Sequence, residues 1–321
     1  MEGASGVSVA ARQLATRPHP AVKVKDPLSR ARAWWGRRLF HSIRVATWAA
    51  CALPRRSAIP VSRALALAVV ASPKSARDRH YVALHQSRAR GVVLQGRARD
   101  DAVRDAFASY GRYWMESLRL RSMAPEQVDA AFTIDGLEHI QAALAAGTGA
   151  ILALPHVGGW EVGGSWLARQ GIPLSAVVEA LEPPELFTWF AELRSSQGFS
   201  VIPLNRTAGI SVVRALRANR VVALVSDRDI AGGGVEVEFF GERTTLPAGP
   251  ATLASRLGVP ILPTAVYFQG DGHHAVVRPP LPIVGDATAT TQALAHQLEE
   301  LIRAAPEQWH LFQPNWPSDR L

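Results

Sequence analysis

Short apolar runs alternate with longer helical patterns through the last two thirds of this 321-residue chain. The apolar runs occupy 150–154, 174–178, 200–203, 221–225, 260–267 and 274–278. The helical patterns between and after them occupy 160–170, 185–195, 210–217 and 289–304. Strand-length runs that alternate with helices of ten or more residues are typical of βαβ units. The pattern therefore predicts an α/β fold with a mostly parallel central sheet flanked by helices.

The chain before the first apolar run has a different pattern. From residue 31 to about residue 123 it is mostly helical, with Pro54, Pro60 and Pro73 as breaks. Residues 1–30 lack periodicity and lack the apolar run of a secretory signal. We therefore expect a flexible basic tail over 1–30 and a single α/β domain over 31–321, which begins with a layer of membrane-associating helices.

The positive charge of the chain is concentrated near its start. The formal net charge is +8, and residues 1–60 hold eleven Lys and Arg against Glu2 and Asp26. In this region apolar residues recur at helical spacing at Trp35, Leu39, Ile43 and Ala46, while Arg30, Arg37 and Arg44 recur every seven residues. A basic helix with large aromatic residues favours the interface of an anionic membrane. A helix packed on the core with a solvated basic face is the alternative, and the absence of a base-reading motif argues against nucleic acid.

Two further features limit the class of protein. No apolar run reaches the roughly 18 residues that span a bilayer, so we expect peripheral attachment at the cytoplasmic face of the cell membrane. Cys51 is the only cysteine, which excludes an internal disulfide and a cysteine-based zinc site and favours a reducing compartment.

The segment Leu154-Pro155-His156-Val157-Gly158-Gly159-Trp160-Glu161 carries the candidate chemistry. His156 falls where a strand ends and a helix begins, the place where α/β sheets build their sites. Glu161 follows five residues later, which on one continuous helix would set the two side chains about 140° apart. They can share a cleft only if His156 lies in the preceding turn. A structural histidine is the alternative interpretation of His156 alone.

Further segments follow in a fixed order. They are 226–229 with 234–241, then 247–251, 260–263 and 309–316. With the His-x4-Glu spacing of His156 and Glu161, they resemble the lysophospholipid acyltransferase superfamily, in its branch of bacterial lipid A and actinobacterial phosphatidylinositol mannoside acyltransferases. The chain departs from that pattern at Gly159, where many relatives place Asn, and in its longer tail.

The resemblance implies an O-acyltransferase that moves a long-chain fatty acyl group from acyl-CoA to a sugar hydroxyl of a glycolipid. The segment 309–316 favours a phosphatidylinositol mannoside acceptor over a lipid A precursor with an acyl carrier protein donor. His156 would be the general base. Of the two acidic candidates we prefer Asp227 for contact with His156, and expect Glu161 to orient the acceptor or support the histidine. No metal and no cofactor besides the co-substrate acyl-CoA is expected.

Other residues are candidates for substrate binding. Arg194 and Arg228 suit phosphate groups, and Glu179 suits a sugar hydroxyl. The oxyanion would be held by backbone amides near Gly158 or by Arg228, and the two stay open. Trp160 is one of several aromatic residues that would line an acyl groove, the others being Trp166, Phe187, Trp189 and Phe190. Asp227 and Asp229 would instead be a turn-forming acidic pair if the segment is structural.

Three rival classes remain. A serine hydrolase needs Gly-x-Ser-x-Gly, and Gly163-Gly164-Ser165-Trp166 lacks the closing glycine. A metalloenzyme needs a recognisable set of metal ligands, and His273, His274 and the His156 segment do not form one. A non-catalytic lipid-binding module explains the basic N-terminal region but leaves 227–241 without a role.

Overall fold

The computed structural model of the chain describes residues 27–179, 184–230 and 232–320. Most of the expected basic tail therefore lies outside the described residues. The side chains of Arg30, Trp35, Arg37 and Leu39 also lie outside them.

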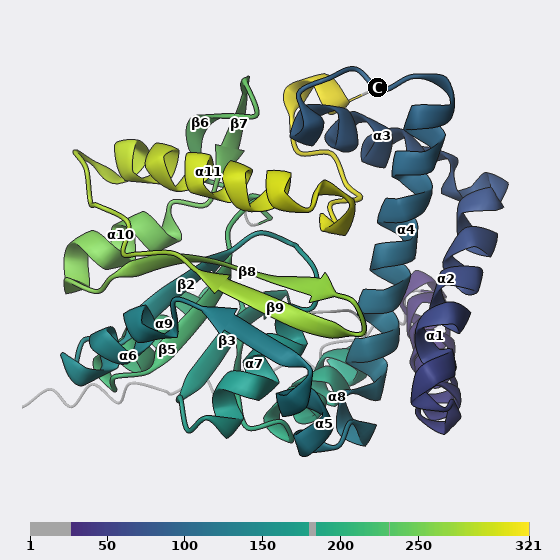
Figure 1. Cartoon of the computed structure of the whole chain (residues 1–321), viewed down its shortest axis with the longest axis horizontal. Helices are drawn as coiled ribbons and strands as arrows, with labels where there is room; N and C mark the ends of the chain where they lie inside the picture. Colours follow the sequence, from purple (N-terminus) through teal and green to yellow (C-terminus); the bar gives the residue numbers. More distant parts are fainter. Residues whose placement is uncertain (1–26, 180–183, 231, 321) are drawn as a thin grey trace, which may run out of the picture.

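A seven-stranded sheet forms the centre of the molecule, in the order β1-β9-β8-β2-β5-β3-β4 (Figure 1). Its strands are β1 Phe132–Asp135, β2 Ala150–Leu154, β3 Leu174–Glu179, β4 Ser200–Leu204, β5 Val221–Val225, β8 Ile261–Gln269 and β9 Gly272–Val277. The neighbouring strands from β8 to β4 are parallel, and only β8 and β9 pair antiparallel. This confirms the predicted α/β fold with a mostly parallel sheet.

Helices cover both faces of the sheet. They are α6 Leu137–Ala145, α7 Trp160–Arg169, α8 Pro184–Ser195, α9 Ala208–Arg217, α10 Gly249–Leu257 and α11 Ala287–Ala304, with the short α5 Pro125–Ala130 before β1. In β2 every residue is buried, and alternate residues enter two separate cores. Ile151 and Ala153 pack with residues of α9, α10 and α11, whereas Leu152 packs with residues of α6 and α7. Such two-sided burial explains why the parallel strands are continuous apolar runs.

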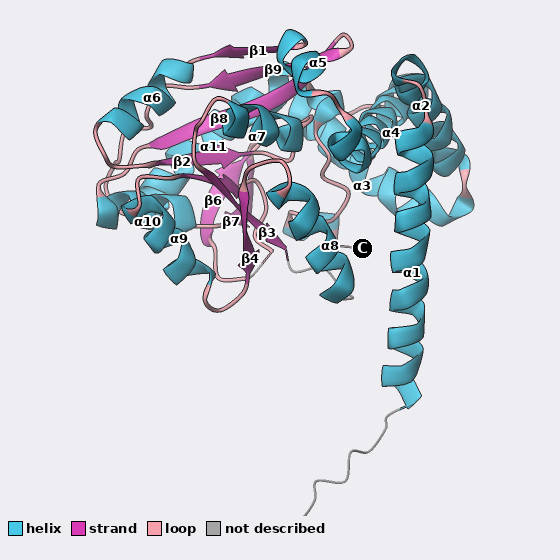
Figure 2. Ribbon diagram, turned by 90° about the horizontal axis from the view of Figure 1, so that it is seen from below, coloured by secondary structure: helices cyan, strands magenta, loops and turns pink. Residues whose placement is uncertain are grey.

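Four long helices lie in the described part of the first 123 residues, a region that the sequence pattern predicts to be mostly helical. They are α1 Pro27–Ala52, α2 Arg55–Ala71, α3 Ala76–Arg90 and α4 Gly96–Arg119. The long α4 stands between the sheet and α1 and α2 (Figure 1), and α1 projects beyond the other helices (Figure 2). Among the described helices, none is both long enough and apolar enough to cross a bilayer.

A close approach fixes α2 against α4. A Cβ atom at Gly111 of α4 would come within 2.9 Å of the Ala66 Cβ and of the Ser62 carbonyl oxygen in α2. Real Cβ atoms do not come so close, so glycine is needed for these helices to pack at this distance.

The sequence pattern did not predict the short strand β1 or the strands of a separate hairpin. β1 is only four residues long, and β6 Val235–Phe239 and β7 Glu242–Leu246 form a separate antiparallel hairpin. Both hairpin strands alternate between buried and exposed positions, a pattern of period two that does not stand out as an apolar run.

Candidate active site

Two adjacent parallel strands bring His156 and Asp227 together. Leu154 at the end of β2 is paired in register with Val225 at the end of β5. Each candidate residue lies two positions beyond its member of this pair. Because β2 and β5 are parallel and in register, both side chains emerge at the same edge of the sheet.

The two side chains make direct contact. His156 Nδ1 lies 2.6 Å from Asp227 Oδ1, and the His156 amide donates to Asp227 Oδ2 at 3.0 Å. The Asp227 side chain is fully buried, whereas that of His156 is 30% exposed. Asp227 is thus the acidic residue in contact with His156, as preferred from the sequence.

Electrostatics fix the proton between these residues. Burial raises the pKa of the Asp227 carboxyl, but the charge of His156 and the hydrogen bonds from His156 and Trp309 outweigh it, so the pKa is lowered overall. A carboxylate only accepts hydrogen bonds, so Nδ1 of His156 carries the proton. In the neutral ring Nε2 then holds a lone pair, and no group in the described ranges bonds to it. The ring is arranged as a general base.

The turn that carries His156 is hydrogen-bonded to two other segments of the chain, one near the C-terminus and one in β8. The Gly158 amide donates to the Gln308 carbonyl at 3.0 Å, and the Gly159 amide donates to the Val266 carbonyl at 2.9 Å. Gly158 has a φ of 58°, and a Cβ atom there would lie 2.0 Å from the Val266 oxygen. Gly158 therefore shapes the turn, and its amide is already occupied. Of the backbone amides near Gly158, those of Gly158 and Gly159 are therefore not free to donate to an oxyanion.

The C-terminal segment completes the environment of Asp227. The Trp309 indole Nε1–H donates to Asp227 Oδ2 at 2.8 Å, and the Asn315 side chain donates to the Asp227 carbonyl at 3.1 Å. Trp309 is 1% exposed. The segment 309–316 was noted in the sequence only for its resemblance, since no spacing rule links Trp309 to a carboxylate 82 residues away.

His310 links this segment to α4. Its amide donates to the His156 carbonyl at 2.7 Å, and its ring Nε2 lies 2.8 Å from the Ser109 hydroxyl. Burial lowers the pKa of His310 to about 3, with a further contribution from the charge of His156. The ring of His310 is therefore neutral at physiological pH and adds no positive charge beside His156.

Glu161 is separated from His156 and pairs with Arg194 instead. Arg194 Nε donates to Glu161 Oε1 at 2.9 Å, and both residues are buried. Glu161 Oε2 is buried without a hydrogen-bond partner among the described residues. The Arg194 guanidinium also lies 5.4 Å from the centre of the Trp160 ring. Glu161 makes no hydrogen bond to His156 among the described residues, and its partner Arg194 lines the same cavity as His156.

A cavity of about 370 Å³ opens in front of the pair. It is lined by six of the expected site residues, namely His156, Trp160, Glu179, Arg194, Arg228 and Asp229. Its remaining wall is mostly apolar, with Val178, Leu204 and Leu253 among its residues. The cavity thus combines a general base, polar groups for a hydroxylated ligand and apolar surface for a chain.

The structure also separates the roles of Arg228 and Asp229. Asp229 accepts from the Gly232 amide at 3.0 Å and from the Gly234 amide at 2.8 Å, so it does act as a turn-forming acid. Arg228 makes one long side-chain hydrogen bond, 3.3 Å to Gln313. Arg228 therefore stays a candidate for the oxyanion, beside the backbone amides near Gly158 at the start of α7.

Only one of the expected groove aromatics reaches this cavity. Trp160 lines it, whereas Trp166 stacks on Phe132 at 4.8 Å between ring centres and Phe190 is buried with Trp114 and Trp189. Tyr113 and Trp114 of α4 line the cavity and were missed. Burial, and then the charge of Glu161, raise the pKa of Tyr113, so its phenol remains a hydrogen-bond donor.

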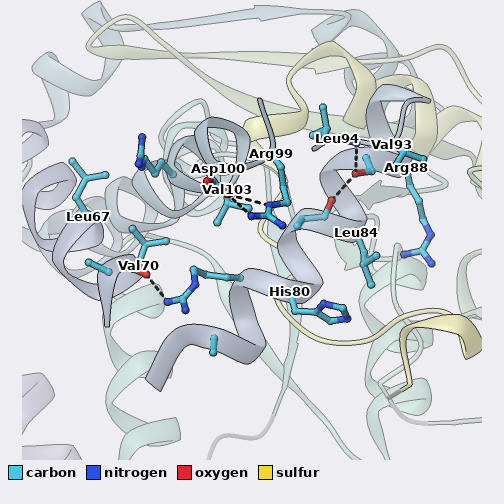
Figure 3. A pocket seen from close by; sticks show the side chains of 16 residues that line it. Leu67, Val70, His80, Leu84, Arg88, Val93, Leu94, Arg99, Asp100 and Val103 are labelled. Carbon is cyan, nitrogen blue, oxygen red and sulfur yellow. Dashed lines mark hydrogen bonds and ion pairs between the residues drawn. The ribbon is translucent and has the colours of Figure 1, made fainter. Parts of the chain in front are cut away.

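A larger hollow between α2, α3 and α4, of about 910 Å³, lacks this chemistry. Its arginines are engaged within the protein. Arg99 pairs with Asp100 at 2.8 Å, and the two side chains lie together in Figure 3. Arg79 donates to the backbone carbonyl of Val70 at 2.7 Å. Among the residues that line it, no histidine contacts a carboxylate. Size alone therefore does not identify the site.

The Trp309 hydrogen bond leads to a first prediction. Trp309→Phe removes the indole donor from a buried carboxylate, a loss that typically costs about 1.5–3 kcal/mol when one partner is charged. We expect turnover to fall on the order of tenfold, with the acidic limb of the pH–rate profile moved to higher pH because the pKa of Asp227 rises.

The matched control is Trp316→Phe. Trp316 is equally buried, and its indole donates to the Phe239 carbonyl at 3.1 Å. Both variants lose packing and one hydrogen bond, but only Trp309 touches Asp227. A pH profile that shifts equally in both variants, or in neither, would contradict a positioning role for Trp309.

Known proteins are similar to this chain over half of its length or more. The family model of bacterial lipid A biosynthesis acyltransferases matches residues 36–318. A phosphatidylinositol mannoside acyltransferase of Mycolicibacterium smegmatis is 42% identical over 224 residues, which cover 68% of this chain and 74% of that protein. One from Mycobacterium tuberculosis is 46% identical over 220 residues, which cover 66% and 69%. A lipid A biosynthesis acyltransferase of Haemophilus influenzae is 29% identical over 182 residues, which cover 54% and 55%.

Proposed function

The chain belongs to the bacterial lipid A biosynthesis acyltransferase family, and on that premise we propose that it moves a long-chain fatty acyl group from acyl-CoA to a sugar hydroxyl of a phosphatidylinositol mannoside. The acceptor rests on the mycobacterial relatives of that name. The observation that carries the proposal is the contact between buried Asp227 and His156, which lines a partly apolar cavity.

The geometry suits attack by an alcohol on a thioester. Nε2 of His156 accepts the proton of the sugar hydroxyl as its oxygen bonds to the carbonyl carbon, and Asp227 stabilises the imidazolium that forms. The tetrahedral intermediate then collapses, the carbon–sulfur bond breaks, and the imidazolium returns its proton to the leaving thiolate. A positioned base of this kind typically contributes about 10²–10⁴-fold.

The other residues of the cavity serve binding. Arg228 faces the cavity and holds the oxyanion or a substrate phosphate. Glu179, exposed at the end of β3, accepts from a sugar hydroxyl. Arg194 attracts a phosphate less strongly than an unpaired arginine would, because Glu161 already neutralises its charge.

Helices α1 and α2 support attachment to an anionic membrane. Neither helix contains an acidic residue. Large apolar side chains are exposed on both: Val45 (65%) and Trp48 (74%) on α1, and Leu65 (59%) and Val69 (53%) on α2. Exposed Arg44 and Arg63 lie on the same two helices. Apolar side chains that enter the interface, together with arginines that meet lipid phosphates, are the usual basis of peripheral binding.

This attachment gives a second prediction. Replacing Trp48 and Leu65 together by Ser removes apolar side chains that burial in a membrane would stabilise by roughly 1.5–3 kcal/mol each. We expect sedimentation with vesicles containing anionic lipid to weaken by on the order of 100-fold or more. Val93→Ser is the control, because Val93 is 81% exposed but follows α3. Unchanged partitioning of the double variant would remove these helices from the membrane contact.

The function itself is tested with radiolabelled long-chain acyl-CoA and a panel of synthetic phosphatidylinositol mannosides. Labelled glycolipid is the expected product. Free fatty acid alone would indicate a hydrolase, and no reaction with any acceptor would favour a lipid-binding module. A parallel assay with acyl carrier protein as the donor tests the lipid A type of reaction, and transfer only from that donor would overturn the acyl-CoA assignment.

A further inference from the structure

A third hollow, lined by both polar and apolar residues, is separate from the cavity that His156 lines. Its volume is about 590 Å³, and it is bounded by the start of α2, the end of α4, α5 and the turn between β8 and β9. It shares no lining residue with the cavity that His156 lines. The acyl-transfer mechanism uses none of its residues.

A buried histidine–carboxylate pair lies at this hollow. His273 Nε2 is 2.8 Å from Glu116 Oε2, and Arg112 Nε donates to Glu116 Oε1 at 2.8 Å. His273 is 5% exposed and Glu116 8%. Burial raises the pKa of Glu116, but the bonds and charges of His273 and Arg112 lower it overall. Glu116 is therefore an ionised acceptor, which places a proton on Nε2 of His273.

The other nitrogen of this ring is left for a ligand. Nδ1 of His273 has no hydrogen-bond partner among the described residues, and the side chain is 4% exposed. His273 lines the hollow. In the neutral ring Nδ1 is thus an acceptor at the hollow, held in position by the hydrogen bond from Nε2 to buried Glu116.

Cationic groups lie at the same hollow. Arg56 is exposed and has no ion-pair partner in the part of the chain that the structure describes. Arg119 uses one nitrogen for the carbonyls of Ala50 and Leu53, which leaves its other guanidinium N–H groups unbonded within the described ranges. Asp271 adds a second acceptor. With Glu116 neutralised by its partners, the two arginines outweigh Asp271, so the hollow favours an anion that also carries hydroxyl groups.

We propose that this hollow binds a phosphorylated polyol, with the phosphate at Arg56 and Arg119 and a hydroxyl donated to Nδ1 of His273. A guanidinium matches phosphate oxygens, whereas the histidine and Asp271 match the hydroxyls of a ring or chain polyol. The ligand is the headgroup of a phospholipid or the free phosphate ester, which share this chemistry.

The hollow also adjoins the turn that carries His156. A Cβ atom at Gly159 would lie 2.7 Å from Nε2 of His273, so the ring packs directly on that turn. Glycine at 159 thus leaves room for His273. A ligand that bonds to Nδ1 contacts a ring whose opposite edge touches the turn.

The test uses the full chain and calorimetric titration with myo-inositol 1-phosphate, the simplest ring polyol phosphate. We expect Arg56→Gln to weaken this binding by about tenfold, as for loss of one charge-assisted bond. Arg63→Gln is the matched control, since Arg63 is exposed on the same helix but does not line the hollow. Arg228→Gln tests binding at the other cavity, and it should leave the Arg56-dependent binding unchanged.

The outcomes separate the alternatives. The proposal would be overturned if Arg56→Gln and Arg63→Gln weakened binding of myo-inositol 1-phosphate equally, or if only Arg228→Gln abolished it. Neither outcome bears on the acyl-transfer reaction. Inorganic phosphate that binds as tightly as the inositol ester would overturn the polyol part. His273→Gln, checked for folding by its melting temperature, should remove that preference for the ester. Titration with short-chain phosphatidylinositol then distinguishes the sources, because tighter binding than the free ester assigns a lipid headgroup.

Discussion

His156→Ala should lower acyl transfer by about 10²–10⁴-fold, the range expected when a positioned base is removed. Binding of both substrates should change little, because the remaining wall of the cavity keeps its polar and apolar groups. The effect should therefore appear in kcat rather than in KM. Single-turnover transfer from radiolabelled acyl-CoA measures it directly.

A matched substitution controls for the loss of a partly exposed imidazole. The His139 side chain is 27% exposed on α6, close to the 30% of His156, and His139→Ala should keep the parental rate. The His156 backbone bonds to Asp227 and His310 do not need the ring, so the variant should remain folded. A folded His156→Ala protein that turns over at the parental rate would exclude the proposed base.

The central strands were predictable because they obey a strong physical rule. A strand that is covered on both faces must be apolar throughout, and β2 and β5 were placed to the residue from that pattern alone. The same parallel arrangement explains the prediction that Asp227, rather than Glu161, contacts His156. On one continuous helix the side chains of His156 and Glu161 would point about 140° apart, whereas a neighbouring parallel strand in register delivers Asp227 to the same edge of the sheet.

The remaining part of the site depends on contacts that sequence spacing does not encode. Trp309 reaches Asp227 only because the C-terminal segment pairs with the turn, through a bridge between Val157 and Trp309. Glu161 pairs with Arg194. Glu161 lies in α7 before β3, and Arg194 lies in α8 after it. The sequence identified Arg194 as a candidate for binding phosphate. That Glu161 neutralises it could not be predicted, because their contact arises from tertiary packing. Likewise, β9 was found as an apolar run while its antiparallel direction was not.

Asp227 also acts on stability, and the direction follows from its lowered pKa. The unfolded carboxyl binds a proton more readily than the folded one, so the stabilisation is complete above the unfolded pKa of about 4 and is lost as pH falls through the folded value. Near pH 7 the carboxylate is fully ionised in both states. Turnover of variants is therefore best compared near neutral pH, where Asp227 stays ionised in the parental protein.

Asp227→Asn should reduce turnover by about 10³–10⁴-fold while the fold is kept, the scale of a carboxylate that sets the tautomer of a catalytic histidine. An Asn side chain can present its NH₂ group to Nδ1, which favours the tautomer with the proton on Nε2 and removes the lone pair that accepts the substrate proton. Glu161→Gln provides the comparison, because Glu161 is as buried and as charged but bonds to Arg194. It should mainly lower the melting temperature and raise KM. If Asp227→Asn kept full turnover and Glu161→Gln lost it, the roles of the two acids would have to be reversed, whatever the distances in the folded chain.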